Sequence, residues 1–216
     1  MSQIKLSPSS LNLMQECPRC FWLHINKVKR PDTPFPSLPS GMDKVLKEHF
    51  DRFMEKGELP PEIREDDCKD CKLFDDKEKL KLWRNNLKGL EYKKGDVLLH
   101  GAVDNILVRN NKLIVLDYKT RGFPLKEDTH EHYQTQMDLY NFLLRKNGYE
   151  TEDYTYLLFY YPNTVTETGE VIFNTKLIKI KTNAKNGEKV FQKAIKIIKG
   201  DMPEKNKDCK FCKWNN

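Results

Sequence analysis

The sequence predicts an α/β or α+β domain in which helices flank a mixed central β-sheet. Three observations point to this class. Apolar residues recur at helical spacing in several segments, two strand-like segments joined by a tight turn occupy the middle of the chain, and two further strand-like runs follow a long helix. The 216 residues can bury one well-filled core, so a single domain over residues 1–216 is expected.

The first part of the chain is expected to be mainly helical. Ser7 is a suitable N-cap and Pro8 fits the first helical position, so a short helix should run toward the first cysteine pair. His49 falls on the apolar stripe of the next helix, which is expected to face inward and is formed by Met42, Val45, Leu46, Phe50 and Phe53. The expected segments are a proline-rich connector at 30–41, a helix at 42–55, an irregular cysteine-containing insertion at 57–75 and a helix at 76–87.

The second part alternates strands and helices. Gly148 is a plausible C′ residue for the long helix, and Gly200 closes the last one. The expected elements are strands over 97–108 and 112–120, a helix over 128–147, strands near 153–161 and 171–181, and a helix over 188–199.

The turn in the middle sets a register. Asn110 and Asn111 separate the two strands, and asparagine tolerates the positive φ that a two-residue hairpin turn requires. With these two residues as the turn, Asp104 lies opposite Asp117 and the small Ala102 lies opposite Lys119.

Three polar side chains should therefore converge. Strand residues two apart share a face, so Asp104, Asp117 and Lys119 lie on one side of the sheet. Two neighbouring carboxylates repel unless a cation neutralises them, and Mg²⁺ or Mn²⁺ does so with oxygen ligands. A buried Asp/Lys ion pair is the alternative, because structural ion pairs are common. The strands alone leave both interpretations open.

Composition limits the cellular context. Residues 1–20 lack the pattern of a signal peptide, and the longest apolar runs are too short to cross a bilayer. A soluble, cytoplasmic protein without a membrane partner is expected. The formal charge of +6 suits a polyanionic partner such as nucleic acid, although charges of both signs are abundant and many belong to ordinary surface.

Three motifs resemble those of a known family. GAVD at 101–104, DYKT at 117–120 and QMDLY at 136–140 together resemble the motif set of RecB-like nucleases in the PD-(D/E)XK superfamily. The resemblance implies a restriction-endonuclease-like core and a metal-dependent DNA exonuclease acting on single-stranded or end-containing DNA. The contexts it implies are DNA recombination and repair, phage DNA metabolism and CRISPR adaptation, with helicase, recombination or CRISPR adaptation proteins as partners.

The resemblance also implies roles for individual residues. Asp104, Asp117 and the backbone carbonyl of Tyr118 would bind Mg²⁺ or Mn²⁺, and Lys119 would be the catalytic lysine. Gln136 and Tyr140 would brace the site or contact DNA. His49 is the best match to a histidine that these nucleases take from the preceding helix, but Gly41 lies further upstream of it than the family glycine does. A core histidine is the alternative.

The cysteines form three Cys-x-x-Cys pairs, and in a reducing compartment this pattern favours metal ligation. The pairs are Cys17 with Cys20, Cys68 with Cys71, and Cys209 with Cys212. Spacing alone allows the outer pairs to share a tetrahedral Zn²⁺ or an iron-sulfur cluster. The resemblance to CRISPR-associated and AddB-type nucleases implies a [4Fe-4S] cluster that clasps residues 1–30 to residues 201–216. The middle pair would complete another site, bind its own metal, be exposed, or be buried as small apolar side chains.

A second function class remains open from the sequence. The chain would then be a non-catalytic nucleic-acid-binding or assembly module built on the four-cysteine centre. For the nuclease hypothesis, four residues near the active strand are candidates for guiding a single strand: Arg121, Phe123, Lys126 and Tyr133. For any one of them taken singly, solvated surface is the safer interpretation.

Overall fold

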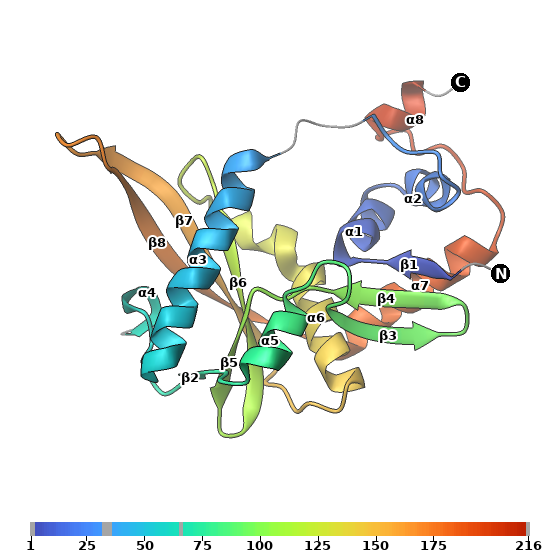
Figure 1. The fold of residues 1–216 in the computed structure, drawn as a ribbon. Coiled ribbons are helices and arrows are strands. Elements are labelled where there is room, and N and C mark those ends of the chain that lie inside the picture. Colours follow the sequence, from blue (N-terminus) through green and yellow to red (C-terminus); the bar gives the residue numbers. More distant parts are fainter. Residues whose placement is uncertain (1–2, 32–35, 65–66, 215–216) are drawn as a thin grey trace.

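The computed structural model describes residues 3–31, 36–64 and 67–214, and its strands form two sheets (Figure 1). The strands are β1 (Ile4–Leu6), β2 (Lys72–Leu73), β3 (Leu90–Lys94), β4 (Val97–Gly101), β5 (Asn105–Arg109), β6 (Lys112–Thr120), β7 (Tyr154–Val165) and β8 (Val171–Lys181). The helices are α1 (Pro8–Glu16), α2 (Pro18–Ile25), α3 (Ser37–Lys56), α4 (Pro61–Arg64), α5 (Lys77–Trp83), the 3₁₀ helix η1 (Thr129–Tyr133), α6 (Gln134–Lys146), α7 (Ala184–Lys199) and α8 (Lys210–Trp214). None of the described helices is both long and apolar enough to cross a membrane.

The larger sheet has the order β2-β5-β6-β7-β8 and is mixed. β5 and β6 pair antiparallel, β6 and β7 pair parallel, and β7 and β8 pair antiparallel. The smaller sheet has the order β1-β4-β3, in which β1 is parallel to β4. The prediction of helices around a mixed central sheet is confirmed.

Helices cover both faces of the larger sheet. On β6, Leu113 and Val115 pack into a cluster with residues of α6 and α7, whereas Ile114 and Leu116 pack with residues of α3 and α4. Side chains alternate along a strand, so the odd-numbered residues of β6 lie on the α6 side. Figure 1 shows α3 crossing the sheet on the side opposite α6. The functional side chains are divided between these two sides.

The expectation of one continuous strand over 97–108 is wrong. The chain leaves the smaller sheet after Gly101 and enters the larger one at Asn105. Between them, the Val103 N–H donates to the carbonyl of Trp83 at 3.1 Å instead of continuing a strand ladder. The apolar residues of this segment fit a strand of either sheet, so the sequence pattern does not reveal that the chain passes from one sheet to the other. Asp104 therefore lies in a connection between two sheets.

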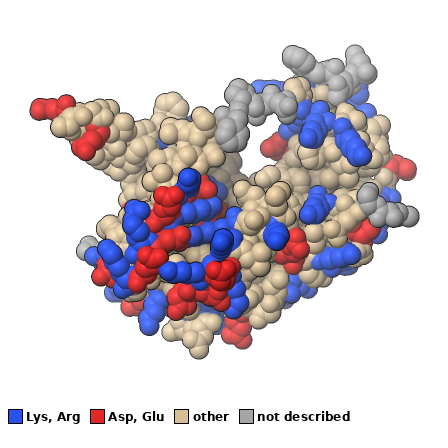
Figure 2. Space-filling view, viewed as in Figure 1, with Lys and Arg blue, Asp and Glu red and all other residues tan. Residues whose placement is uncertain are grey.

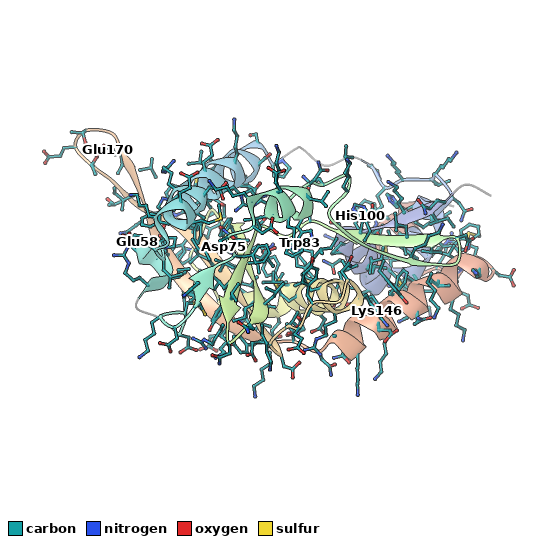
Figure 3. The ribbon with its side chains drawn as sticks, turned by 60° about the horizontal axis from the view of Figure 1, so that its bottom comes forward. Glu58, Asp75, Trp83, His100, Lys146 and Glu170 are labelled. Atoms are coloured by element: carbon teal, nitrogen blue, oxygen red, sulfur yellow. The ribbon has the colours of Figure 1, made fainter. Side chains whose placement is uncertain are left out.

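Other boundaries differ in detail. Ser7 caps α1 through a reciprocal hydrogen-bond pair with Ser10, as its position predicted. The helix expected over 128–147 begins as η1 and becomes α-helical at Gln134, and Gly148 follows it with φ +85°. The insertion at 57–75 is less irregular than expected, because it contains α4 and contributes β2 to the sheet edge beside β5. At the other edge the β7–β8 hairpin projects from the body, with Glu170 at its tip (Figure 3).

A close helix contact predicts the first mutational result. A Cβ at Gly187 of α7 would lie 2.5 Å from the backbone carbonyl oxygen of Asp138 in α6. We expect Gly187→Ala to lower the free energy of unfolding by about 1–3 kcal/mol, because one backbone must move away from the other. Gly41→Ala is the matched control: that glycine is helical with nothing within 4 Å, so alanine should be neutral or stabilising. Equal urea midpoints for wild type and Gly187→Ala would contradict the contact.

Candidate active site and four-cysteine centre

The predicted turn and its register are both present. Asn110 and Asn111 have φ values of 49° and 61°, and β5 pairs with β6 so that Asn105 lies opposite Leu116. Asp104 immediately precedes Asn105 and stands next to the end of this ladder, on the side of Asp117. A two-residue turn with left-handed backbone therefore brings the two carboxylates to one place.

Asp117 and Lys119 face α6. The Lys119 ammonium contacts the Asp117 carboxylate, lies 3.2 Å from Oε1 of Gln136 and sits 4.7 Å from the centre of the Tyr133 ring. Gln136 in turn donates to the hydroxyl of Tyr140 at 2.8 Å. The four residues predicted from DYKT and QMDLY thus form one hydrogen-bonded chain, whose inner end is a carboxylate only 2 % exposed.

Asp104 is fixed by backbone contacts. Its Oδ2 accepts a hydrogen bond from the N–H of Tyr118 at 2.9 Å, and its carbonyl accepts one from Nε of Arg84 at 2.7 Å. Arg84 is itself held by Asp51 at 2.8 Å. The side chain of Tyr118 points to the opposite face and packs on Phe50. Asp104 is therefore positioned while one carboxylate oxygen, Oδ1, faces the site.

Sequence reasoning missed two residues of α3. The Lys47 ammonium lies 3.1 Å from Oδ1 of Asp104 and 2.7 Å from Oδ2 of Asp43. The signal was their i, i+4 spacing, which places them on one side of a helix. It was hidden because α3 begins at Ser37, earlier than expected, and because Val45, assigned to the inward stripe, is 56 % exposed.

His49 lies elsewhere. Its Nε2 is 3.0 Å from Oε1 of Glu62 in α4, and the same carboxylate oxygen accepts a hydrogen bond from Tyr160. The ring also packs edge-on against Phe50 and Phe53, on the α3 side of the sheet. The structure therefore brings His49 to Glu62 and not to Asp104 and Asp117.

The oxygen atoms present suit a hard divalent cation. Asp104 and Asp117 provide carboxylates beside each other, and the carbonyl of Tyr118 belongs to the intervening backbone. Oxygen-only donor sets are those that Mg²⁺ and Mn²⁺ prefer. Burial, with a smaller contribution from the nearby Asp104 charge, raises the pKa of Asp117 from 3.8 to about 7 even though Lys119 opposes the shift. The ionised form of Asp117 is therefore costly in this buried position, and a bound cation would offset that cost.

This raised pKa predicts the pH dependence of stability. Between about pH 4 and about pH 7 the folded chain holds a proton on Asp117 that the unfolded chain has released, so its contribution to the free energy of unfolding falls as pH rises. A divalent cation binds only the ionised carboxylate, so the stabilisation it gives should grow across the same range. We expect the rise in melting temperature on adding Mn²⁺ to be larger near neutral pH than near about pH 5. An Asp117→Asn chain showing the same pH-dependent rise would contradict this.

A polar cleft adjoins the site. It has a volume of about 250 Å³, and Gln136 and Tyr140 form part of its wall together with His100 and Ala102. The predicted pairing of Ala102 with Lys119 is wrong, because β5 begins only at Asn105, but Ala102 does line this cleft together with Gln136.

A second groove lies between α3 and α5 and is lined by charged side chains of both signs. It encloses about 410 Å³, and ion pairs cross its lining, Lys77 with Glu55 at 2.9 Å and Arg84 with Asp51 at 2.8 Å. Figure 2 shows acidic and basic side chains interleaved over these two helices. Such a surface gives a polyanion no net attraction.

The predicted guiding residues follow β6 directly. Phe123 is 78 % exposed and Lys126 is exposed, so both are free to meet a ligand. Arg121 is half-buried, and its N–H donates to the carbonyl of Tyr160. Tyr133 lies under Lys119. The loop after Lys119 therefore presents an aromatic ring and a basic side chain beside the site.

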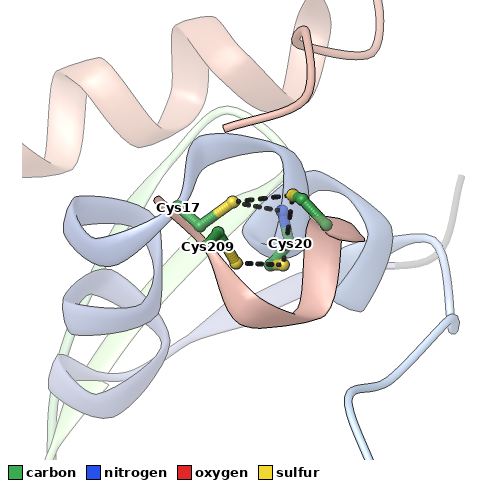
Figure 4. A group of neighbouring side chains, drawn as sticks. Cys17, Cys20 and Cys209 are labelled. Atoms are coloured by element: carbon green, nitrogen blue, oxygen red, sulfur yellow. Dashed lines mark hydrogen bonds between the residues drawn. The ribbon is translucent and has the colours of Figure 1, made fainter. Parts of the chain in front are cut away.

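The outer cysteine pairs meet, as predicted. Sγ of Cys17 is 3.4 Å from Sγ of Cys212, and Sγ of Cys20 is 3.6 Å from that of Cys209. All four sulfur atoms lie within 4.8 Å of one another and are buried. Figure 4 shows the thiols of the two distant segments pointing toward each other. The four residues close α2 and α8 together and can hold a metal.

The middle pair is separate. Cys68 and Cys71 are 0 % and 5 % exposed and pack into the apolar cluster on the α3 side of the sheet, which excludes exposed thiols and a shared site with the outer pairs. The Cys71 N–H donates to the Cys68 carbonyl at 2.7 Å. Hydrogen bonding from Cys68 lowers the pKa of Cys71 to about 7, against the effect of burial and with help from Arg109. In the described residues this pair is part of the core.

Comparison with known proteins agrees with the geometry. The sequence has no significant match among curated proteins. A family profile described as the PD-(D/E)XK nuclease superfamily matches residues 38–216, which include every element of the larger sheet. Members of this superfamily are metal-dependent nucleases. The chain, with Asp104, Asp117 and Lys119 gathered at the end of its mixed sheet, belongs to the PD-(D/E)XK nuclease superfamily.

Proposed function

We propose that the chain is a Mg²⁺- or Mn²⁺-dependent deoxyribonuclease that acts on single-stranded or end-containing DNA. The observation that supports this most is the convergence of Asp104, Asp117 and Lys119, with Gln136 hydrogen-bonded to the lysine. Superfamily membership supplies the reaction class, which is phosphodiester hydrolysis. The nucleic acid type and the preference for ends are our proposal.

The residues divide the chemistry among them. A divalent cation held by Asp104, Asp117 and the Tyr118 carbonyl would activate water and stabilise charge on a phosphoryl oxygen. Lys119 would neutralise the negative charge that develops on the scissile phosphate. Gln136 holds the Lys119 ammonium at 3.2 Å, and Tyr140 orients Gln136. Catalysis then depends on a lysine whose position is set from α6.

The surroundings favour a flexible strand over a rigid duplex. Phe123 offers an exposed ring on which a base can stack, and Lys126 lies in the same loop to contact phosphate. The cleft lined by Gln136 and Tyr140 has a volume of only about 250 Å³. DNA recombination, phage DNA metabolism and CRISPR adaptation all generate such ends, with helicase, recombination or adaptation proteins as candidate partners.

The test uses end-labelled linear DNA, single- and double-stranded, beside circular single-stranded DNA, each with Mn²⁺, Mg²⁺ or a chelator. We expect metal-dependent loss of the linear single strand and resistance of the circle. Cleavage of the circle would show an endonuclease. Binding without cleavage in any metal would instead favour the non-catalytic nucleic-acid-binding module.

A further inference from the structure

The spacing of the four outer cysteines distinguishes between their possible metals. The sulfur contacts between the two segments measure 3.4, 3.6 and 4.0 Å, and no pair exceeds 4.8 Å. A single tetrahedral Zn²⁺ with bonds of about 2.3 Å places its sulfur ligands about 3.8 Å apart. A cubane cluster binds each cysteine through a different iron, which spreads the sulfurs to roughly 6 Å. The observed spacing matches the single ion.

The surroundings fit a closed structural site. All four cysteines are at most 8 % exposed, and all four ligands come from the protein, leaving no coordination position for substrate. The N–H of Cys20 points to Sγ of Cys17 at 3.4 Å. The Arg30 guanidinium lies 3.5 Å from Sγ of Cys209 and 4.4 Å above the Phe211 ring, where its charge offsets that of four thiolates around a divalent ion.

We propose that Cys17, Cys20, Cys209 and Cys212 hold one Zn²⁺ ion in place of the [4Fe-4S] cluster that the family resemblance implies. This proposal does not depend on nuclease activity. It makes the centre a structural clasp without redox chemistry.

The test measures metal and sulfide in the full chain, expressed with iron and zinc both supplied and purified without oxygen, so that a cluster cannot be lost to air. We expect one zinc per chain, no acid-labile sulfide and no visible colour. Replacement by Co²⁺ should give the intense visible bands of a tetrahedral thiolate site. Cys212→Ser should lose the zinc, whereas Cys71→Ser in the middle pair should keep it. A brown protein with about four irons and four sulfides per chain would overturn the proposal.

A separate observation concerns the active site. The Lys47 ammonium bridges two carboxylates, Asp43 at 2.7 Å and Asp104 at 3.1 Å, and the oxygen that it contacts on Asp104 is the one not used by the Tyr118 N–H. A cation between these oxygens is favourable, but an ammonium and a divalent ion repel and cannot share them. One must leave when the other binds.

We infer that Asp43 is a further ligand of the divalent cation and that Lys47 is the counter-ion that the cation displaces. This rests on the proposed metal-dependent nuclease. In this site α3 contributes a carboxylate where the sequence predicted the imidazole of His49, which contacts Glu62 instead.

Calorimetric titration with Mn²⁺ tests this without cleavage. We expect Asp43→Asn to weaken Mn²⁺ binding at least tenfold and Lys47→Met to strengthen it, since nothing need then be displaced. Glu55→Gln and Lys77→Met are matched controls, because they remove an exposed pair of the same chemistry, 2.9 Å apart, that also involves α3. Wild-type affinity in Asp43→Asn, or unchanged or weaker affinity in Lys47→Met, would overturn the inference.

The titration and the cleavage assay distinguish a failure of the ligand assignment from a failure of the proposed nuclease function. A wild type that binds Mn²⁺ with the expected variant pattern but cleaves no DNA would refute the nuclease and leave the ligand assignment standing. A wild type that cleaves DNA while Asp43→Asn binds Mn²⁺ normally would support the nuclease and refute the assignment of Asp43 as a ligand. A wild type that binds no Mn²⁺ at all would overturn both.

Discussion

Lys119→Met should reduce Mn²⁺-dependent DNA cleavage by roughly a thousandfold or more while the protein stays folded. Methionine keeps an aliphatic side chain against Tyr133 but removes the charge that lies beside Asp117 and Gln136. The loss arises in the chemical step, because that charge is needed as negative charge develops on the phosphate. It should appear in kcat at saturating metal and DNA.

The measurement needs saturating Mn²⁺. Without Lys119 the buried Asp117 loses its counter-ion, which makes its ionised form harder to maintain and weakens metal binding as a side effect. Lys112→Met is the matched control, since Lys112 lies on the same strand in a loose, exposed ion pair with Glu152 at 3.9 Å. Cleavage within tenfold of wild type in Lys119→Met, at saturating metal, would exclude Lys119 from the chemistry.

Replacing both Cys20 and Cys212 by serine should remove the metal ion proposed for the four-cysteine centre. It should also lower the free energy of unfolding by several kcal/mol, because binding energy at a structural metal site is also folding energy. α8 has only five residues, and among its described side chains only Cys212 is buried and only Phe211, which lies under Arg30, is half-buried. We expect a lower melting temperature and rapid proteolysis after the end of α7, with the larger sheet still protected.

The middle cysteines provide the comparison for this double variant. Cys68→Ala also changes a buried thiol, but it removes only core packing and should cost roughly 1 kcal/mol with the metal retained. Proteolysis and melting that are the same for the two proteins would mean that the outer cysteines stabilise by packing alone.

The convergence of the catalytic candidates was predictable because it depends on local rules. Asparagine accepts positive φ, so the turn at Asn110–Asn111 fixed the register, and alternation along β6 placed Asp117 and Lys119 on one face. The spacing of Gln136 and Tyr140 on one helix needs no tertiary information. These parts of the site follow from two neighbouring strands and one helix.

The parts that could not be predicted depend on distant partners. Val97–Gly101 pairs with β1 and β3, which no local pattern distinguishes from pairing with β6. The side of α3 that meets the site was misassigned because Val45 is exposed and the helix begins within a proline-rich segment. Asp43 and Lys47 have no distinguishing feature in the sequence, and only the fold places Asp104 beside them.

The clasp between α2 and α8 also has a mechanical consequence. The segments that carry Cys17 and Cys212 are held together by the four cysteines and by hydrogen bonds such as that from Arg19 to the Pro203 carbonyl, so tension applied to these two segments would be carried first by the clasp. The five-stranded sheet would feel none of it while the metal stays bound. Loss of the proposed ion would open the clasp and let the same force reach the sheet and the carboxylates at its end.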